Sequence, residues 1–212
     1  QSEVAKTIAS TLGAELTVSE EKELASAKEI HPMAYDYYLK SDIGGNSNED
    51  DIEQAIRYLE KALEYEPEYI EAIIKLANWH GWMYFLGLDR TDLRLAENRK
   101  YLDMAKSIAP DEPLVFQAEG TYYYRMFRDY DKAFELFDKA NLKTADSYAF
   151  RAWVLRRLGR WDECIEYILK SIELNPKAAG IYRELGGTYN AIGDYDKALE
   201  ALNTAIGLVP ND

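Results

Sequence analysis

Reactive side chains are few in this 212-residue chain, and their spacing does not suit catalysis. The two histidines, His31 and His80, and the single cysteine, Cys164, are far apart in the sequence. They give neither a metal-ligand spacing nor a nucleophile and base pair. No glycine-rich phosphate loop or catalytic carboxylate pair stands out either. We therefore expect no catalytic residues, no metal site and no cofactor.

The acidic segment 42–53 superficially resembles a calcium-binding loop. Ser47 replaces the glycine that the sharp turn of such a loop needs, and Gly44 removes a ligand. An acidic turn that caps the following helix is the better interpretation.

The distribution of charge along the chain is more informative about binding than the reactive side chains are. The net charge of −13 argues against binding of nucleic acid, which needs a surplus of Lys and Arg. Residues 1–66 hold fifteen acids and six bases, whereas residues 113–160 hold six acids and nine bases. Ordinary variation between solvated helices is one explanation. The other is a binding surface, because arginine grips carboxylates with two hydrogen bonds and stacks on aromatic rings.

A repeated phrase predicts the elements that carry these side chains. Gly159-Arg-Trp-Asp is followed by Pro176, and Gly193-Asp-Tyr-Asp is followed by Pro210. The second glycine and the second proline each lie 34 residues after the first. Apolar residues recur at helical spacing on both sides of Gly193, which predicts two amphipathic helices joined by a tight turn. Gly186 lies where the helices would cross closely, and Asp194 or Asp196 can cap the second helix. Such a pair buries its apolar face only by stacking on further pairs.

These residues resemble the tetratricopeptide repeat. Its pattern of an aromatic residue, Leu-Gly, Tyr, Ala, a Phe-like residue, Ala and Pro is matched almost throughout by residues 177–210. The preceding copy departs from the pattern, because Arg151, Cys164 and Ser171 replace Leu, Ala and Ala. We expect Cys164 to be packed at a helix contact. The resemblance implies an all-α fold, a right-handed α-solenoid of about five helix pairs.

The five expected repeats span residues 32–67, 68–110, 111–142, 143–176 and 177–210. Pro67 and Pro110 stand 43 residues apart, so we expect an insertion near residues 87–95. The third copy has no closing proline, and we expect a short exit loop after Ala140. The aromatic segment 78–85 is interpreted as core packing of an overlong helix, with a ligand pocket as the alternative.

Residues 1–31 are expected to be N-terminal helices and a linker from a preceding domain. Residues 4–12 form an amphipathic pattern, and Thr17 to Glu20 is a capping box. Residues 11–39 resemble the junction in bacterial multidomain regulators, where such repeats follow an adenylate or guanylate cyclase, DNA-binding or TolB-like domain. This resemblance implies a fragment of a larger bacterial protein.

In this repeat family the first helix of each pair lines the concave groove. Transferred to the present chain, the groove positions hold arginines, aromatics and amides, with no carboxylate among the candidate contacts Asn78, Trp82, Gln117, Thr121, Tyr124, Arg125, Trp153, Arg156, Arg157, Arg183 and Asn190. The dicarboxylate clamp of chaperone-binding members is not expected. Only Asn78 matches that clamp, and Ile74, Ala118, Asp146 and Phe150 occupy its other places.

We therefore expect a non-catalytic protein–protein interaction module, which binds a peptide or partner segment with acidic residues in its groove. The alternative is a regulatory or oligomerisation fragment of a multidomain enzyme such as a nucleotide cyclase. Replacing Arg156 and Arg157 with Glu is expected to weaken partner binding without unfolding.

Three further expectations concern membrane contact, self-association and location in the cell. No apolar run approaches the roughly 18–20 residues of a membrane helix, so no membrane partner is expected. The last repeat lacks a covering helix, which favours a homodimer through that end. A cytoplasmic location fits the single cysteine.

Overall fold

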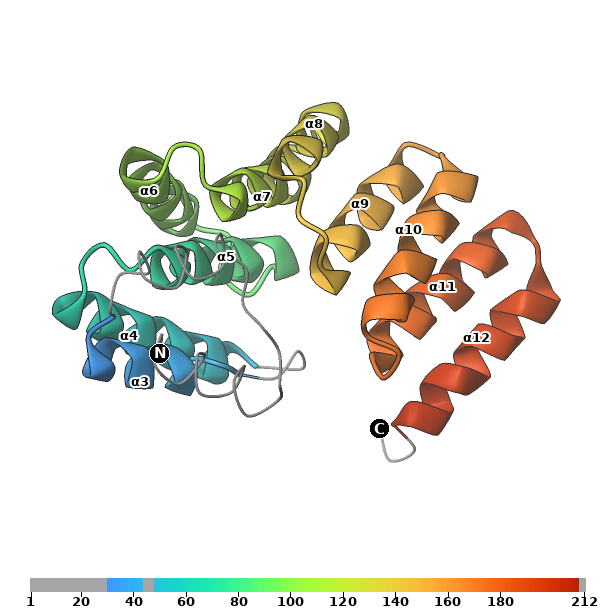
Figure 1. Cartoon of the computed structure of the whole chain (residues 1–212), viewed down its shortest axis with the longest axis horizontal. Helices are drawn as coiled ribbons and strands as arrows, with labels where there is room; N and C mark the ends of the chain where they lie inside the picture. The colour runs from blue at the N-terminus through green and yellow to red at the C-terminus, as the bar shows by residue number, and fades with distance from the viewer. Residues whose placement is uncertain (1–29, 44–47, 210–212) are drawn as a thin grey trace, which may run out of the picture.

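The computed structural model describes residues 30–43 and 48–209. Within these residues the chain is all helical and forms five antiparallel helix pairs (Figure 1). In chain order the helices are α3 (Pro32–Lys40) with α4 (Glu49–Tyr65), α5 (Ile70–Leu86) with α6 (Asp92–Ile108), α7 (Pro113–Tyr122) and the π-helix η1 (Tyr123–Phe127) with α8 (Tyr130–Ala140), α9 (Ala145–Arg157) with α10 (Trp161–Leu174), and α11 (Ala179–Ile192) with α12 (Tyr195–Leu208). The predicted α-solenoid is confirmed.

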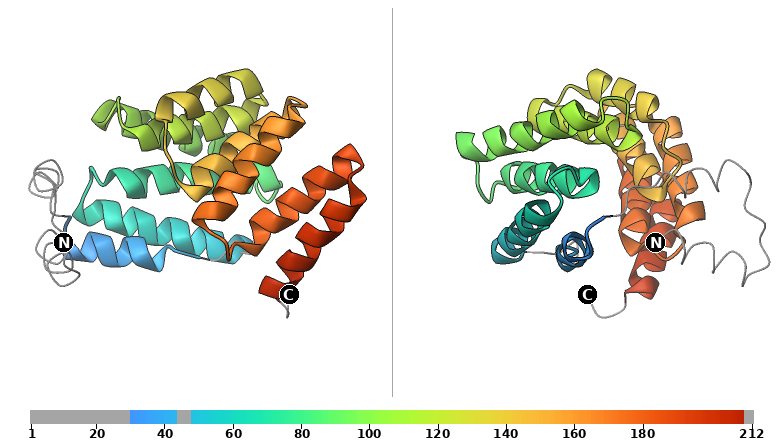
Figure 2. Two further views of the ribbon diagram at one scale, coloured as in Figure 1. Left: turned by 45° about the vertical axis from the view of Figure 1, so that its right-hand side comes forward. Right: turned by 60° about the vertical axis from the view of Figure 1, so that its left-hand side comes forward.

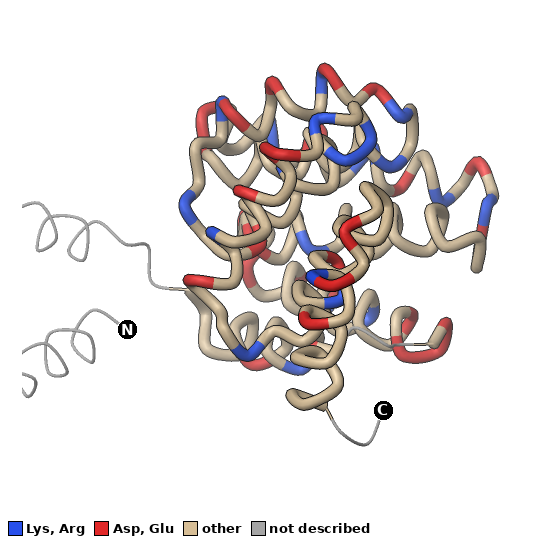
Figure 3. Tube along the Cα trace, turned by 90° about the vertical axis from the view of Figure 1, so that its right-hand side faces the viewer, with Lys and Arg blue, Asp and Glu red and all other residues tan. Residues whose placement is uncertain are grey.

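The pairs stack along a curved path that brings the first and last pairs to the same side of the molecule (Figures 1 and 2). One apolar core runs from α3 to α7, and a second joins α9 and α10 to α11 and α12. Smaller clusters around Phe137 and Leu136 connect α7 and α8 to their neighbours. Basic and acidic residues are interspersed along the helices in Figure 3. None of the helices within the described ranges has the length and hydropathy that a membrane span requires.

Short polar side chains fix where helices begin. Asn48 caps α4 in a reciprocal pair with Asp51, so part of the acidic segment 42–53 serves as the helix cap that the sequence predicted. Asp194 accepts a hydrogen bond from the Lys197 amide and caps α12, also as predicted. The predicted helix at 4–12 and the capping box at Thr17 lie outside the described residues.

The extra residues of the second pair are distributed differently from the prediction. Both α5 and α6 have 17 residues, against 14 in α11 and α12. The connection is residues 87–91, against Gly193 and Asp194 in the last pair. The insertion is therefore one extra turn on each helix plus a longer loop, because added turns keep their backbone hydrogen bonds and bury more apolar surface.

The third pair is shorter than the others, and its missing residues lie in an unexpected place. The loop after Ala140, residues 141–144, is four residues long, the same length as the loops 109–112 and 175–178. The deletion lies in α8, which has only 11 residues. Asn141 ends it with a φ of 47°, a left-handed conformation that asparagine tolerates better than most residues. The prediction of a short exit loop was wrong for this reason.

The predicted close crossing is confirmed at Gly186, a second one lies at Gly120, and together they lead to a stability prediction. A Cβ on Gly120 would lie 2.6 Å from the Phe137 ring, and one on Gly186 would lie 2.7 Å from Leu202. Each added Cβ would also lie close to a backbone carbonyl, 3.2 Å from that of Ala133 or 3.1 Å from that of Ala198. Phe137 is 2% exposed, whereas Leu202 is 37% exposed and is less confined by neighbours. We expect both substitutions to destabilise, and Gly120→Ala to cost about 1 kcal/mol more than Gly186→Ala. Urea denaturation compares them; equal costs would contradict the argument.

Candidate functional site

The candidate site is an open cavity of about 410 Å³ between α5, η1 and α9. Each of these elements belongs to the first helix of its pair, so three successive repeats contribute. Its walls combine aromatic rings with polar and charged groups, namely Lys75, Asn78, Trp79, Trp82, Arg125, Asp146 and Phe150. The cavity has the mixture of rigid apolar surface and a few polar groups that is typical of recognition sites.

Arg125 is the central charge of this cavity. Its guanidinium carbon lies 4.5 Å from the centroid of the Trp82 ring and 5.9 Å from that of Phe85. Among the described residues it forms no hydrogen bond or ion pair. Burial lowers the pKa of Arg125 to about 10, so the side chain remains charged at neutral pH. Stacking on these rings fixes the guanidinium and leaves its N–H groups available as hydrogen-bond donors.

The π-helix η1 explains where Arg125 lies. Eight residues separate Gly120 from Arg128, whereas seven separate Ala152 from Gly159 and Gly186 from Gly193. Arg128, Gly159 and Gly193 all have positive φ at the ends of their helices. The extra residue is accommodated as a π turn, in which the Arg128 amide donates to the Tyr123 carbonyl. This one-residue difference was the available sequence signal, and pattern matching by helical period missed it.

The structure brings three of the predicted groove residues together in the cavity: Asn78, Trp82 and Arg125. Core packing accounts for most of segment 78–85, because His80 and Met83 are buried and Trp79 and Trp82 pack against the first core. The two tryptophans also line the cavity, and Phe85 is 37% exposed. Sequence reasoning missed Lys75 and Trp79 because both stand just outside the assumed stripe.

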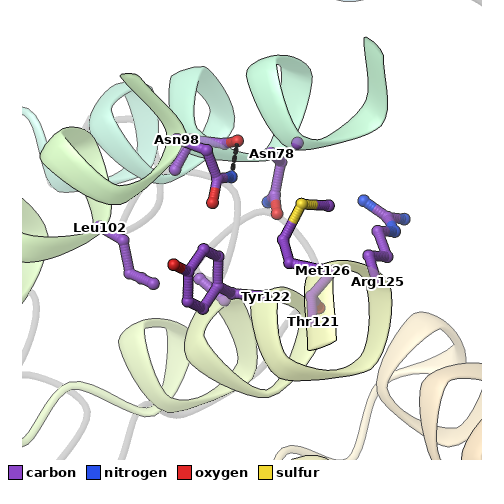
Figure 4. A pocket seen from close by; sticks show the side chains of 10 residues that line it. Asn78, Asn98, Leu102, Thr121, Tyr122, Arg125 and Met126 are labelled. Carbon is purple, nitrogen blue, oxygen red and sulfur yellow. Dashed lines mark hydrogen bonds between the residues drawn. The ribbon is translucent and has the colours of Figure 1, made fainter. Parts of the chain in front are cut away.

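Two predicted groove residues lie deeper in the fold. Thr121 is buried and its hydroxyl donates to the Gln117 carbonyl, so it offers no contact surface. The Gln117 side-chain oxygen is buried without a hydrogen-bond partner in the described part of the chain. Thr121 lines a separate space of about 10 Å³, enough for a single water (Figure 4). In the same view the Asn98 amide bonds the Ala77 carbonyl, and Arg125 extends away from it toward α5.

Other predicted residues form the surroundings of the cavity. Trp153 packs edge-on against Phe150 with centroids 5.1 Å apart. Tyr124 packs on Tyr130 at 5.7 Å. A hydrogen bond with Tyr124 raises the pKa of Arg157, whose side chain is exposed. The contact between Tyr124 and Arg157 connects η1 to α9.

Arg156, Arg183 and Asn190 do not join the cavity. Arg156 donates to the Glu184 carboxylate on α11, so its charge is already paired. The expectation of a groove without carboxylates is corrected by Asp146, which lines the cavity with three of the predicted residues. Reversing Arg156 would set two carboxylates against each other between α9 and α11. Arg183 and Asn190 are exposed on α11, beyond the cavity.

The polar atoms of the cavity are mostly donors. Trp79 has a buried indole N–H without a partner among the described residues. The Lys75 ammonium lies 3.4 Å from the Asp42 carboxylate, which is largely exposed. Asp146 is the exposed carboxylate on the α9 side of the cavity. The cavity therefore favours an acceptor or an anion over a cation.

The histidines and the cysteine lie elsewhere. His80 is buried and stacks on Tyr101 with centroids 5.6 Å apart, and Cys164 is buried at a helix contact, as predicted. Burial raises the pKa of the Cys164 thiol, which keeps it protonated. In the ranges 30–43 and 48–209, no three His, Cys, Asp or Glu side chains cluster as a metal site.

Comparison with known proteins agrees with this architecture. Tetratricopeptide repeat family models match residues 37–69 and residues 151–212. The human cell division cycle protein 16 homolog is 25% identical over 158 residues, covering 68% of this chain and 25% of its own length. Anaphase-promoting complex subunit 6 of Arabidopsis thaliana is 29% identical over 121 residues, covering 53% and 22%. The chain thus spans about a quarter of the length of these curated relatives.

The solved structures show the same fold. A thermophilic TPR protein of Thermus thermophilus matches with a TM-score of 0.63 at 20% identity, covering 77% of this chain and 86% of that one. The fold defines a helical-repeat protein, in which each repeat packs on its neighbours. The chain contains tetratricopeptide repeats.

Proposed function

We propose that this chain is a scaffold module that binds an extended segment of a partner protein across the first helices of its repeats. The observation that carries the proposal is the open cavity shared by α5, η1 and α9. Partly exposed aromatic rings beside a fixed cation supply rigid contact area at low entropic cost. Relatives named as subunits of the anaphase-promoting complex support a role in binding other proteins.

Peptide selection tests the proposal. Random peptides displayed on phage are selected against the chain, and the affinity of the selected sequences is measured by fluorescence anisotropy. Trp82→Ala is expected to weaken them by about 2 kcal/mol, roughly thirtyfold, because it removes a central anchor of the cavity. Leu93→Ala is the matched control, since Leu93 is 68% exposed on α6, outside the cavity. Failure to select any peptide, or equal effects of both variants, would contradict the proposal.

The charge reversal is better made at one arginine. Because Arg156 pairs with Glu184, Arg157→Glu tests the surface without breaking the ion pair between α9 and α11. We propose that it weakens acidic peptides by roughly three- to fivefold, as expected for a partly screened surface charge. Anisotropy at two salt concentrations checks this. An affinity that is unchanged at low salt would remove Arg157 from the binding surface.

We also propose that α12 contacts a second copy of the chain. Tyr195, Leu199 and Ile206 are 70%, 62% and 64% exposed, and Leu202 and Val209 complete an apolar row with alternating spacings of four and three residues. Such a row is typical of a seam between two helices. Light scattering should give the mass of a dimer, which Leu199→Glu with Ile206→Glu converts to monomer. A monomer at high concentration before substitution would refute this.

The alternative class is a regulatory part of a multidomain bacterial enzyme, such as a nucleotide cyclase, in the cytoplasm. It rests on the resemblance of residues 11–39 to a regulator junction, most of which lies outside the described residues. The coding sequence upstream of Gln1 decides between the two: a catalytic domain there favours this alternative.

A further inference from the structure

We propose that the cavity between α5, η1 and α9 anchors one acidic side chain, Asp or Glu, of the partner segment, with Arg125 as its counter-charge. This inference rests on the proposed peptide-binding function and assigns the residue chemistry that the central subsite selects.

Arg125 differs from the other arginines with little exposure. Among the described residues, four further arginines are buried or half-buried, and each has a carboxylate partner: Arg94 with Glu53 and Asp89, Arg99 with Asp103, Arg151 with Asp138, and Arg156 with Glu184. Arg125 has only the rings of Trp82 and Phe85. The fold therefore pairs its partly buried guanidinium groups and leaves this one open toward the cavity.

An unpaired charge in this position has a cost that a bound carboxylate would remove. A partly desolvated cation is unfavourable without a counter-ion, and the attraction of aromatic faces replaces only part of its hydration. A carboxylate can accept two parallel hydrogen bonds from the guanidinium fork. Since stacking on Trp82 already orients that fork, little conformational entropy is lost when the carboxylate binds.

The rest of the lining fits the same ligand. Asn78 offers an amide, and Trp79 lines the cavity with a ring whose buried indole N–H lacks an acceptor in the described residues. Phe150 and Trp82 provide apolar walls for the methylene stem of the ligand side chain. Asp146 lies on the α9 side and disfavours a second carboxylate next to the first. The subsite is therefore selective for a single acid.

The test uses peptide pools with blocked ends, so that any carboxylate belongs to a side chain. Each pool fixes the central residue as Glu, Asp, Gln, Asn or Lys and randomises the other positions among uncharged residues. Binding to the chain and its variants is measured by anisotropy. Arg128→Gln is the matched control, because it removes the same charge three residues away from an exposed position outside the cavity.

The unmodified chain is expected to prefer the Glu or Asp pool over its amide counterpart by roughly tenfold or more. Arg125→Gln should abolish this preference, Arg125→Lys should retain part of it, and Arg128→Gln should leave it intact. Asp146→Asn should strengthen binding of the acidic pools by roughly two- to fivefold. Thermal melting confirms that each variant is folded.

The outcomes separate the two proposals. Pools that bind without preference for an acid, or an acid preference that survives Arg125→Gln, would overturn this inference and leave peptide binding intact. Absence of binding by every pool would overturn the proposed function and the acidic subsite with it. If Arg125→Gln does not fold, an acid preference that is smaller in a folded Arg125→Lys variant than in Arg128→Gln decides in favour, and full retention decides against.

Discussion

Replacing Arg151 with leucine, the residue that the repeat pattern has at this place, is expected to destabilise the fold by about 2–3 kcal/mol. Arg151 is only 4% exposed and its guanidinium is surrounded by acceptors. It donates to the carbonyls of Phe137 and Leu142 and to the Ser147 hydroxyl. Its Nε lies 3.3 Å from the Asp138 carboxylate.

These contacts follow from the shortened helix α8. Because α8 ends at Ala140, the chain enters α9 through a loop whose carbonyls lie beside the start of the next repeat. Arg151 reaches back from α9 and satisfies them. Leucine would leave the Leu142 carbonyl and the Ser147 hydroxyl without this donor in a buried place, and an unpaired buried polar group is costly.

Guanidinium denaturation measures the change in unfolding free energy. An unchanged dependence of that free energy on denaturant concentration shows that only the stability differs between the variants. Arg160→Leu is the control, because its ion pair with Glu163 is solvent-exposed and should contribute much less to stability. If Arg151→Leu is neutral or stabilising, then the departure from the repeat pattern has no structural role and this account of α8 is wrong.

The second large effect is a loss of stability in mild acid that depends on His80. Burial, followed by the nearby Arg94 charge, lowers the pKa of His80 from 6.5 to about 4. Glu97 and Glu53 raise the pKa in part, and Lys100 lowers it further. In the structure the ring is held neutral: Arg94 lies 3.1 Å from Nδ1, and Tyr101 stacks on the ring.

The sign follows from proton binding. Between pH 6.5 and 4 the unfolded chain binds a proton at His80 and the folded chain does not, so acid favours unfolding. The stabilising contribution is present above the unfolded pKa and is lost as the pH falls toward the folded pKa. From these values we expect a loss of about 2 kcal/mol between pH 7 and pH 5.

Urea denaturation at pH 7 and pH 5 checks this prediction. His80→Gln keeps an acceptor for Arg94 and cannot titrate, so its stability should fall less than that of the unmodified chain by about 2 kcal/mol over the same interval. The same fall in stability in the His80→Gln variant would place the acid sensitivity elsewhere.

The repeat period alone was enough to predict the helix pairs, because the features that form them are local. Glycine at a tight turn, a small residue at a crossing and an aspartate at a helix start all act within a few positions of themselves. Gly186 and Asp194 therefore have the roles that their positions predicted. Length changes were harder to place, since a helix of 14 or of 17 residues satisfies its backbone equally well.

The sequence by itself determined the solenoid, its periodic core and the residue types on the first helices. Only the tertiary structure decided which of those residues meet. Arg156 forms an ion pair with Glu184 of the next repeat. Arg125 is displaced by a single π turn, so it lies against the rings of Trp82 and Phe85 and has no carboxylate partner among the described residues. Pairing depends on distances between side chains in different repeats, and one extra residue in one helix changes those distances without altering the apolar pattern.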